Sequence, residues 1–296
     1  MSRAKRGPWI AAPALVALVL SVAGCGAGFT VRARGLVPVA GVGAGAGETS
    51  VGAGAGVGVG VGEIGDDELP ALPEGPAEPT GISPASTNGA GAPASRYASL
   101  DRVRCEAELG KRNIGFERVG EARGVIAPLR LKGPIAGVDF HSMLPAAQRR
   151  TSPYEIYDCR LVLALDDWAR VLARHDVVEV VHYSVYRPPP AKAVLNGPGR
   201  RHSGALAIDA AIFKTRDGRT MSVEKDFHGR IGSKPCGAGA APVTGLPAQA
   251  VTLRQIVCEA ADAQLFNVML TPDYNWPHRN HFHLEVTAGV RWVLVR

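Results

Sequence analysis

The sequence predicts an α+β fold for residues 96–296, in which a small antiparallel β-sheet is flanked by two or three helices. Short runs of alternating apolar and polar residues, typical of half-buried strands, are interspersed with longer segments of helical periodicity. Asp217-Gly218 lies between two alternating runs, 205–214 and 219–223, which is a strong β-hairpin signal. No strand–helix–strand unit is repeated, so a parallel sheet of the α/β class is not expected.

Upstream of the hairpin the pattern predicts two helices and three strands. The first helix begins after Ser99, a favourable N-cap residue, and holds Cys105. The second spans residues 157–174, where apolar side chains, Trp168 among them, recur with helical spacing. The expected strands are 124–131, 136–140 and 177–186.

Downstream of the hairpin the pattern predicts one more helix and three strands. Thr252 is expected to cap a helix that runs to Leu265. The expected strands are 268–270, 281–286 and 290–295. A few helices on a sheet of short strands place the domain in the α+β class.

The first 25 residues have the features of a bacterial lipoprotein signal peptide. A basic start is followed by an apolar run, 9–22, that is too short for a membrane span. The run ends in Val22-Ala23-Gly24-Cys25, which matches the signal after which the cysteine becomes lipidated. The alternatives are an ordinary secretory signal with a chance cysteine and a short interfacial anchor. We expect an exported lipoprotein of the cell envelope, anchored to a membrane through Cys25 and facing the periplasm.

Residues 26–95 are rich in Gly, Ala, Val and Pro, including the repeat 57–62 and the proline-rich stretch 70–84. Such a segment offers too few large apolar side chains to offset the entropy lost on ordering. We therefore expect a disordered tether before one domain at 96–296.

Four cysteines remain after Cys25, namely Cys105, Cys159, Cys236 and Cys258. An even number in an exported protein predicts two disulfides, for which three pairings are possible. The formal net charge is +6, but the basic residues are dispersed and no nucleic-acid-binding motif accompanies them. We expect a monomer that binds no nucleic acid and meets an anionic envelope polymer or lipid headgroups.

Three histidines lie within six residues in His278-Arg-Asn-His281-Phe-His283. His281, His283 and Glu285 alternate with apolar residues, so on a strand their side chains share one face. Two imidazoles and a carboxylate, with one place left for water, form the ligand set of a catalytic zinc site. The remaining histidines of the domain, expected at surface or hydrogen-bonded core positions, are His141, His175, His182 and His228.

A second constellation lies upstream, where Asp209 follows His202 by seven positions in a strand-forming context. At these residues the chain resembles the bacterial extensin-like protein C-terminus family. The matching segments are Arg201 to Phe213, Asp217 to Val223 and Leu270 to Glu285, with Cys105, Cys159 and Trp168. That family is similar to lysostaphin-type peptidases, D-Ala-D-Ala carboxypeptidases, murein endopeptidases and hedgehog domains, which share His-x6-Asp and His-x-His around one zinc on a small antiparallel sheet.

The resemblance implies a zinc site and roles for its neighbours. His202, Asp209 and His283 become the Zn²⁺ ligands. His281 becomes the general base near the metal, and His278 an accessory group. An imidazole that titrates near neutrality suits proton transfer.

Arg187 matches an arginine that follows a strand in the relatives, where it would bind a substrate carboxylate or a developing oxyanion. The alternative is a solvated arginine at a strand end. The relatives usually have a cysteine before this arginine, where this chain has Tyr186, while Cys236 lies in an inserted segment. The simplest pairing is then Cys236–Cys258 together with Cys105–Cys159.

The chain departs from the pattern of the relatives near the expected ligands. Arg200 stands where they usually have serine, Ala205 where they usually have glycine, Asn280 where they usually have aspartate, and Glu285 where they also have aspartate. The expected function is a zinc-dependent peptidase or amidase acting on peptidoglycan or its stem peptides. The alternative is a non-catalytic envelope protein that binds wall polymer with the same fold.

Overall fold

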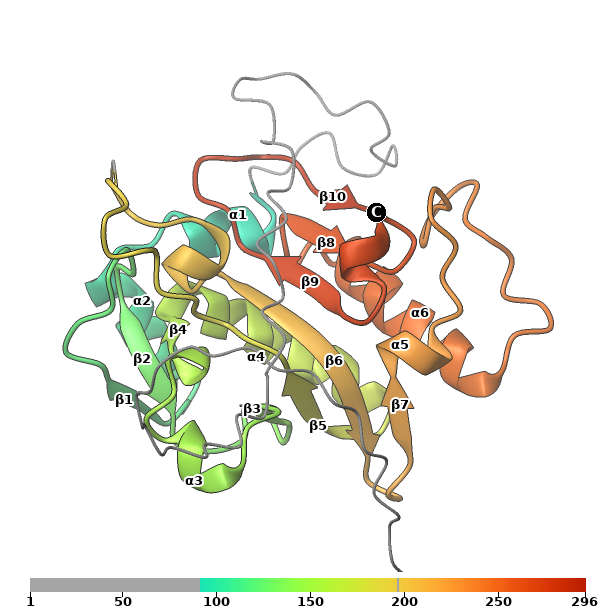
Figure 1. The fold of residues 1–296 in the computed structure, drawn as a ribbon, viewed down its shortest axis with the longest axis horizontal. Helices are drawn as coiled ribbons and strands as arrows, with labels where there is room; N and C mark the ends of the chain where they lie inside the picture. The colour runs from blue at the N-terminus through green and yellow to red at the C-terminus, as the bar shows by residue number, and fades with distance from the viewer. Residues whose placement is uncertain (1–90, 196) are drawn as a thin grey trace, which may run out of the picture. The chain divides into compact units, whose positions relative to one another are not determined.

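The computed structural model describes residues 91–195 and 197–296, which form an α+β domain (Figure 1). The expected signal peptide, the lipidation of Cys25 and the expected tether as far as residue 90 lie outside the described residues. The first helix, α1 (Pro93–Ala98), buries Ala94 and Tyr97, so the fold begins slightly before the expected residue 96. Within the described ranges, every helix is too short or too polar to cross a membrane.

The main sheet has seven strands in the order β10-β8-β9-β6-β5-β3, with β7 paired to β6. The strands are β3 (Asp139–Ser142), β5 (Val177–His182), β6 (Ala207–Thr215), β7 (Thr220–Ser222), β8 (Val268–Leu270), β9 (Phe282–Glu285) and β10 (Leu294–Val295). The hairpin expected at Asp217-Gly218 is confirmed, because β6 and β7 pair as antiparallel neighbours across that turn.

The sheet is mixed rather than wholly antiparallel, which corrects the expectation. The central pairs β5–β6, β6–β9 and β8–β9 are antiparallel. The outer pairs β3–β5 and β10–β8 are parallel. Parallel neighbours need a long connection, and the one between β3 and β5 contains the helix α4 (Cys159–Arg174).

A second sheet of three antiparallel strands has the order β1-β2-β4. Its strands are β1 (Phe116–Arg118), β2 (Pro128–Leu131) and β4 (Tyr157–Asp158). Because Tyr157 and Asp158 pair with β2, α4 begins at Cys159, two residues later than expected. The Asp158 side chain caps α4 by accepting from the Arg160 backbone N–H at 3.0 Å.

Two expected helix caps are wrong. Ser99 ends α1, and the Asp101 side chain caps α2 (Arg102–Lys111) instead. The helix expected to start at Thr252 is α6 (Ala248–Asp262), which begins directly after Pro247. The shorter helical elements are α3 (Ala146–Arg149), α5 (Val223–Asp226), η3 (Pro153–Glu155), η4 (Arg201–Gly204) and η5 (Trp276–His278).

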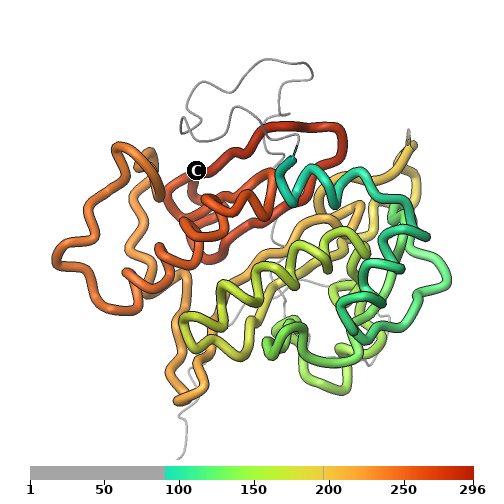
Figure 2. Tube along the Cα trace, turned by 180° about the vertical axis from the view of Figure 1, so that it is seen from behind, coloured from blue at the N-terminus to red at the C-terminus, as the bar shows by residue number. Residues whose placement is uncertain are grey.

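Helices α4 and α6 cover one face of the main sheet, which is the near side in Figure 2. Trp168 of α4 is the centre of the packing, with ring centroids 5.8–6.1 Å from Phe140, Phe213 and Phe266. Burying an aromatic or large aliphatic side chain contributes about 1.5–3 kcal/mol. The helix-covered face is therefore the main source of stability, and the opposite face is available for polar side chains.

A β-bulge in β6 decides which of its residues lie on each face. Val181 pairs with Ile212 and His182 with Ala210, so Ala211 is an extra residue with no partner of its own. The apolar core contains Ala210 and also Phe213, three positions later. Asp209 consequently lies on the open face although it is an even number of residues from Phe213.

Both expected disulfides are present. Cys105–Cys159 joins α2 to the start of α4, and Cys236–Cys258 joins the loop before α6 to that helix. Two disulfides in one domain are typical of an oxidising, exported environment.

Candidate metal centre

Three elements bring the expected ligands together. Asp209 on β6 and His283 on β9 are directly paired in the antiparallel register. His202 belongs to η4, the turn immediately before β6. Ala205 ends η4 with a left-handed φ of 54°, and its N–H donates to the His202 carbonyl at 3.1 Å. This tight turn folds His202 back over the start of β6.

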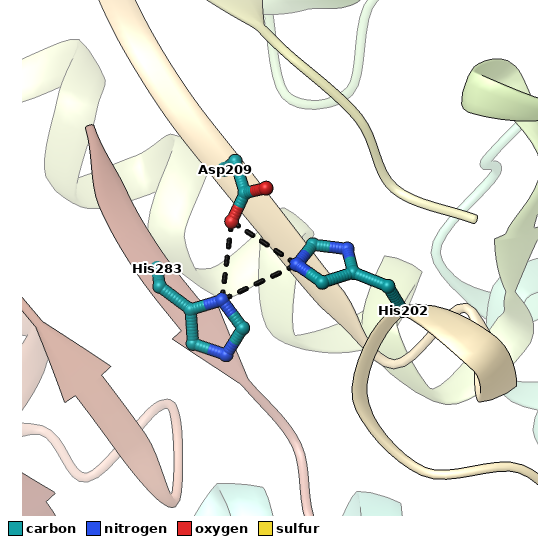
Figure 3. A group of neighbouring side chains, drawn as sticks. All are labelled: His202, Asp209 and His283. Carbon is teal, nitrogen blue, oxygen red and sulfur yellow. Dashed lines mark hydrogen bonds and ion pairs between the residues drawn. The ribbon is translucent and has the colours of Figure 1, made fainter. Parts of the chain in front are cut away.

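The ligand atoms of the three residues form a nearly equilateral triangle (Figure 3). Asp209 Oδ1 lies 3.1 Å from His202 Nε2 and 3.1 Å from His283 Nδ1, and the two nitrogens are 3.3 Å apart. Tetrahedral zinc with bonds of about 2.0–2.1 Å places its ligand atoms about 3.3 Å apart. The triangle therefore has the size of one face of a zinc tetrahedron.

The hydrogen bonds of both histidines leave lone pairs at the centre of this triangle. His202 Nδ1 donates to the Val185 carbonyl at 2.8 Å, so Nε2 carries the lone pair. Glu285 Oε2 lies 3.4 Å from His283 Nε2, which favours the proton there and the lone pair on Nδ1. A carboxylate oxygen and two imidazole lone pairs repel each other unless a proton or cation lies between them. The donor set fits a divalent zinc ion, whose histidine ligands commonly donate their other N–H to a carbonyl or carboxylate.

Burial and mutual attraction shift the pKa values of this group in opposite directions. Burial raises the pKa of Asp209, but the favourable interactions of its carboxylate with the His202 and His281 side chains outweigh burial and hold that pKa well below its usual value. Burial lowers the pKa of His283, but hydrogen bonds with Asp209 and Glu285 raise it to about 9. Without a metal, the cluster therefore keeps a proton on His283, and a metal ion would have to displace it.

The other two histidines of the cluster lie close by but outside the triangle. The group whose ligand atoms all lie within 4.8 Å of one another, among the described residues, consists of His202, Asp209 and His283. His281 Nε2 is 3.4 Å from Asp209 Oδ1, and its Nδ1 donates to Asn280 Oδ1 at 2.8 Å.

His278 is buried, and its ring centroid lies 5.2 Å from that of His281 and 5.8 Å from that of His283. Its Nδ1 donates to Asn275 Oδ1 at 2.5 Å. Burial, together with the neighbouring His283 and His281, lowers the pKa of His278 to about 3, so this ring is neutral.

Arg187 directly contacts Asp209, one of the candidate ligands. Its Nη2 forms an ion pair with Asp209 Oδ2, and its Nε donates to Ser184 Oγ at 2.9 Å. Ser184 Oγ in turn donates to Asp209 Oδ2 at 3.3 Å. Both partners hold the outer carboxylate oxygen, so Oδ1 is the oxygen that faces the two histidines. Sequence reasoning missed Ser184, because a serine three residues before an arginine carries no recognisable signal.

The other histidines occupy structural positions, as expected. His141 Nε2 is 2.9 Å from Glu179 Oε1, and His175 Nε2 is 2.8 Å from Glu259 Oε1. His182 is fully buried, and its Nε2 is hydrogen-bonded to the Tyr157 hydroxyl at 2.9 Å. His228 is exposed.

Fold and site together define an α+β domain that gathers two histidines and an aspartate into a candidate metal centre. The chain belongs to the extensin-like protein C-terminus family, whose model matches residues 105–296. This match confirms the family expected from the sequence and includes all candidate ligands and both disulfides. No curated protein and no solved structure matches the chain.

Proposed function

We propose that the protein is a zinc-dependent peptidase or amidase acting on the peptides of cell-wall peptidoglycan. The observation that carries the proposal is the triangle of buried ligand atoms, with edges of 3.1, 3.1 and 3.3 Å. Three protein ligands leave a fourth position for water or substrate, which is the arrangement of catalytic rather than structural zinc.

His202, Asp209 and His283 would hold the ion. Bound zinc lowers the pKa of its water to about 7 and polarises a carbonyl group. Arg187 and Ser184 fix the orientation of the Asp209 carboxylate through its outer oxygen. Glu285 fixes the ring of His283 in the same way, through Nε2.

His281 is the proposed general base. Asn280 Oδ1 accepts from its Nδ1, so in the neutral form of the ring Nε2 carries the lone pair and faces the Asp209 side of the site. There it accepts a proton from the attacking water and returns it to the leaving amine, which is the usual contribution of a positioned imidazole. His278, neutral and packed against His281, restricts that ring to one orientation.

Peptidoglycan is the proposed substrate because three features of the chain suit a protein that works in the cell envelope. The lipoprotein-like signal ending at Cys25 would export and anchor the chain. The two disulfides suit an oxidising compartment. The formal net charge of +6 suits a polymer whose peptides carry free carboxylates.

The test combines metal content with product release. Purified protein is expected to hold about one zinc, and His202→Ala, Asp209→Asn and His283→Ala to lose it, because a site with three protein ligands cannot spare one. His281→Ala is expected to retain most of the zinc and to release new amines from purified peptidoglycan about 10²–10⁴-fold more slowly than the wild type. Metal analysis and amine labelling give the two readouts, and thermal unfolding shows whether each variant folds.

His228→Asn is the matched control, since this exposed histidine lies outside the site and should change neither readout. Full zinc occupancy in folded His283→Ala would refute the ligand assignment. A zinc-loaded wild type that binds peptidoglycan but releases no amine would instead establish a non-catalytic wall-binding protein.

A further inference from the structure

A pocket of about 240 Å³ lies beside the candidate metal centre. Its apolar walls are Ile126, Pro198, Leu206 and Ala288, and its charged lining residues are Arg160, Arg200 and Glu285. A concave site that combines apolar walls with a few polar groups is typical of a small-molecule subsite.

The main chain beside Arg200 is held in one position. A Cβ atom on Gly199 would lie 2.4 Å from the Ser203 carbonyl oxygen, so only glycine fits there. The Gly199 N–H also donates to the Gly124 carbonyl at 2.8 Å. The pocket wall that carries Arg200 is therefore pre-formed by close backbone packing.

Two of the three charged lining residues are already engaged within the protein. The buried Arg160 guanidinium donates from Nε and Nη2 to the two Asp158 oxygens at 2.7 and 3.0 Å. Thr287 Oγ1 donates to Glu285 Oε1 at 2.7 Å, and Arg201 Nε lies 3.6 Å from Glu285 Oε2. Each of these charges is balanced by a neighbour of opposite sign.

Arg200 is different, because its exposed guanidinium forms no hydrogen bond or ion pair with any described residue. The negative charge of Asp158 neutralises the positive charge of Arg160, and the positive charge of Arg201 neutralises the negative charge of Glu285. One positive charge in the pocket lining is therefore not compensated. That charge belongs to Arg200, and a guanidinium fork matches a carboxylate in a bidentate geometry.

We propose that this pocket binds a free carboxylate on an aliphatic amino-acid residue of the substrate, with Arg200 as the group that binds it. The apolar walls receive the aliphatic part. In a wall peptide this chemistry has two sources, a C-terminal D-alanine and the free end of a diaminopimelate side chain. The inference rests on the proposed function for its choice of substrate.

Glu285 connects the pocket to the metal centre. Its carboxylate lines the pocket, and its Oε2 is 3.4 Å from His283 Nε2. A substrate residue held here is therefore separated from the proposed ligand atom, His283 Nδ1, by the Glu285 carboxylate and the imidazole ring of His283.

The test is calorimetric titration of the full chain with four small probes. D-alanyl-D-alanine and meso-diaminopimelate carry the carboxylate, whereas D-alanyl-D-alaninamide and 1,5-diaminopentane lack it. The two carboxylate probes are expected to bind about tenfold or more tightly than their counterparts, because a hydrogen bond to a charged group discriminates by that amount. The tighter of the two carboxylate probes identifies the source.

Arg200→Gln is expected to reduce the affinity for the carboxylate probes about tenfold and to leave that for the amide unchanged. Ala288→Trp, at the exposed rim, should block all four probes without disturbing the core. Arg216→Gln is the matched control, since this exposed arginine, also without a side-chain partner among the described residues, lies at the far end of β6.

Equal affinity for acid and amide, unchanged binding in Arg200→Gln, or no binding of any carboxylate probe would each overturn the proposal. Titration in the presence of a chelator separates this result from the proposed function. If the protein binds the carboxylate probes but releases no amine from peptidoglycan, the proposed pocket is supported and the proposed peptidase function is contradicted. If the protein releases amine and Arg200→Gln leaves KM unchanged, the peptidase function is supported and the proposed role of the pocket is contradicted.

Discussion

Ala205 is held in a backbone conformation that favours glycine. Its φ of 54° lies in the left-handed region, and its side chain is fully buried. The tight turn that positions His202 depends on this conformation, because the N–H groups of Ala205 and Leu206 both bond back into η4. The glycine usual at this position in the relatives removes the strain that a Cβ atom causes there.

Ala205→Gly is therefore expected to stabilise the protein. Relief of the left-handed backbone strain is expected to raise the free energy of unfolding by about 1–2 kcal/mol. The greater conformational freedom of glycine in the unfolded chain lowers it by only about 0.5–1 kcal/mol. The expected net gain in the free energy of unfolding is about 0.5–1 kcal/mol, measured by urea denaturation. Ala207→Gly, within regular β6, is the control and should destabilise. A less stable Ala205→Gly would show that the turn carries no strain.

At the same scale, the sequence predicted the candidate ligands that the structure brings together, but few of the groups that orient them. His202, Asp209 and His283 follow from spacing and from the family resemblance. Val185, by contrast, contributes a backbone carbonyl, which has no side-chain signature. Ser184 meets Asp209 only because β5 and β6 pair across a bulge, a tertiary fact that local patterns do not contain.

Among the elements, the segment between Phe227 and Pro247 has little regular structure and is fixed by a few contacts. The Cys236–Cys258 disulfide joins it to α6. The Gly232 N–H donates to the Asp273 carbonyl at 2.7 Å, and Asp273 is buried beside Arg254 of α6. Removing the disulfide leaves these polar contacts as the principal restraints on the segment.

Cys236→Ala/Cys258→Ala is therefore expected to expose this segment to trypsin at Arg230. The chain-entropy model gives a loss of about 3 kcal/mol in the free energy of unfolding for a loop of this length. Mass mapping of the fragments and urea denaturation provide the measurements. Cys105→Ala/Cys159→Ala is the control, with a loss of about 4 kcal/mol and no new cleavage at Arg230. Identical digestion patterns in both double variants would contradict the local role of Cys236–Cys258.

Local signals predicted the elements better than they predicted their pairing. Asp217-Gly218 identified its hairpin, and residues 268–270 form β8 as expected. The start of α6 was missed because Pro247 precedes it without a side-chain cap. The parallel pairs β3–β5 and β10–β8 join segments tens of residues apart, and no short-range pattern encodes such contacts.

Taken as a whole, the domain joins its candidate ligands from three separate segments. His202 precedes β6, Asp209 lies within it, and His283 lies on β9, more than seventy residues later. An ion bound by all three would cross-link these segments in the folded state only, and a ligand specific to the folded state raises stability by mass action.

Metal removal is accordingly expected to lower the Tm of the whole domain. Zinc at about one hundred times its Kd stabilises by about 2.7 kcal/mol, which corresponds to about 5–10 °C for a domain of this size. Calorimetry with and without a chelator measures the shift, and Asp209→Asn should show none. An unchanged Tm for metal-free wild type would indicate that zinc is not bound by the three segments together.

Ala211, which has no partner in β5, fixes the number of residues that β6 needs between Asp209 and Phe213. The Asp209 side chain must lie on the polar face of the sheet, while Phe213 packs in the aromatic cluster around Trp168 on the other face. Both are possible only because the bulge adds one extra residue, Ala211, between them. Deleting Ala211 would turn the side chains of one half of β6 to the opposite face of the sheet. Either the Asp209 carboxylate would then enter the apolar core, or the Phe213 ring would be exposed to water. The turn at Gly218 lies outside this constraint, whereas the four-residue step from Asp209 to Phe213 must be kept for both side chains to reach their faces of the sheet.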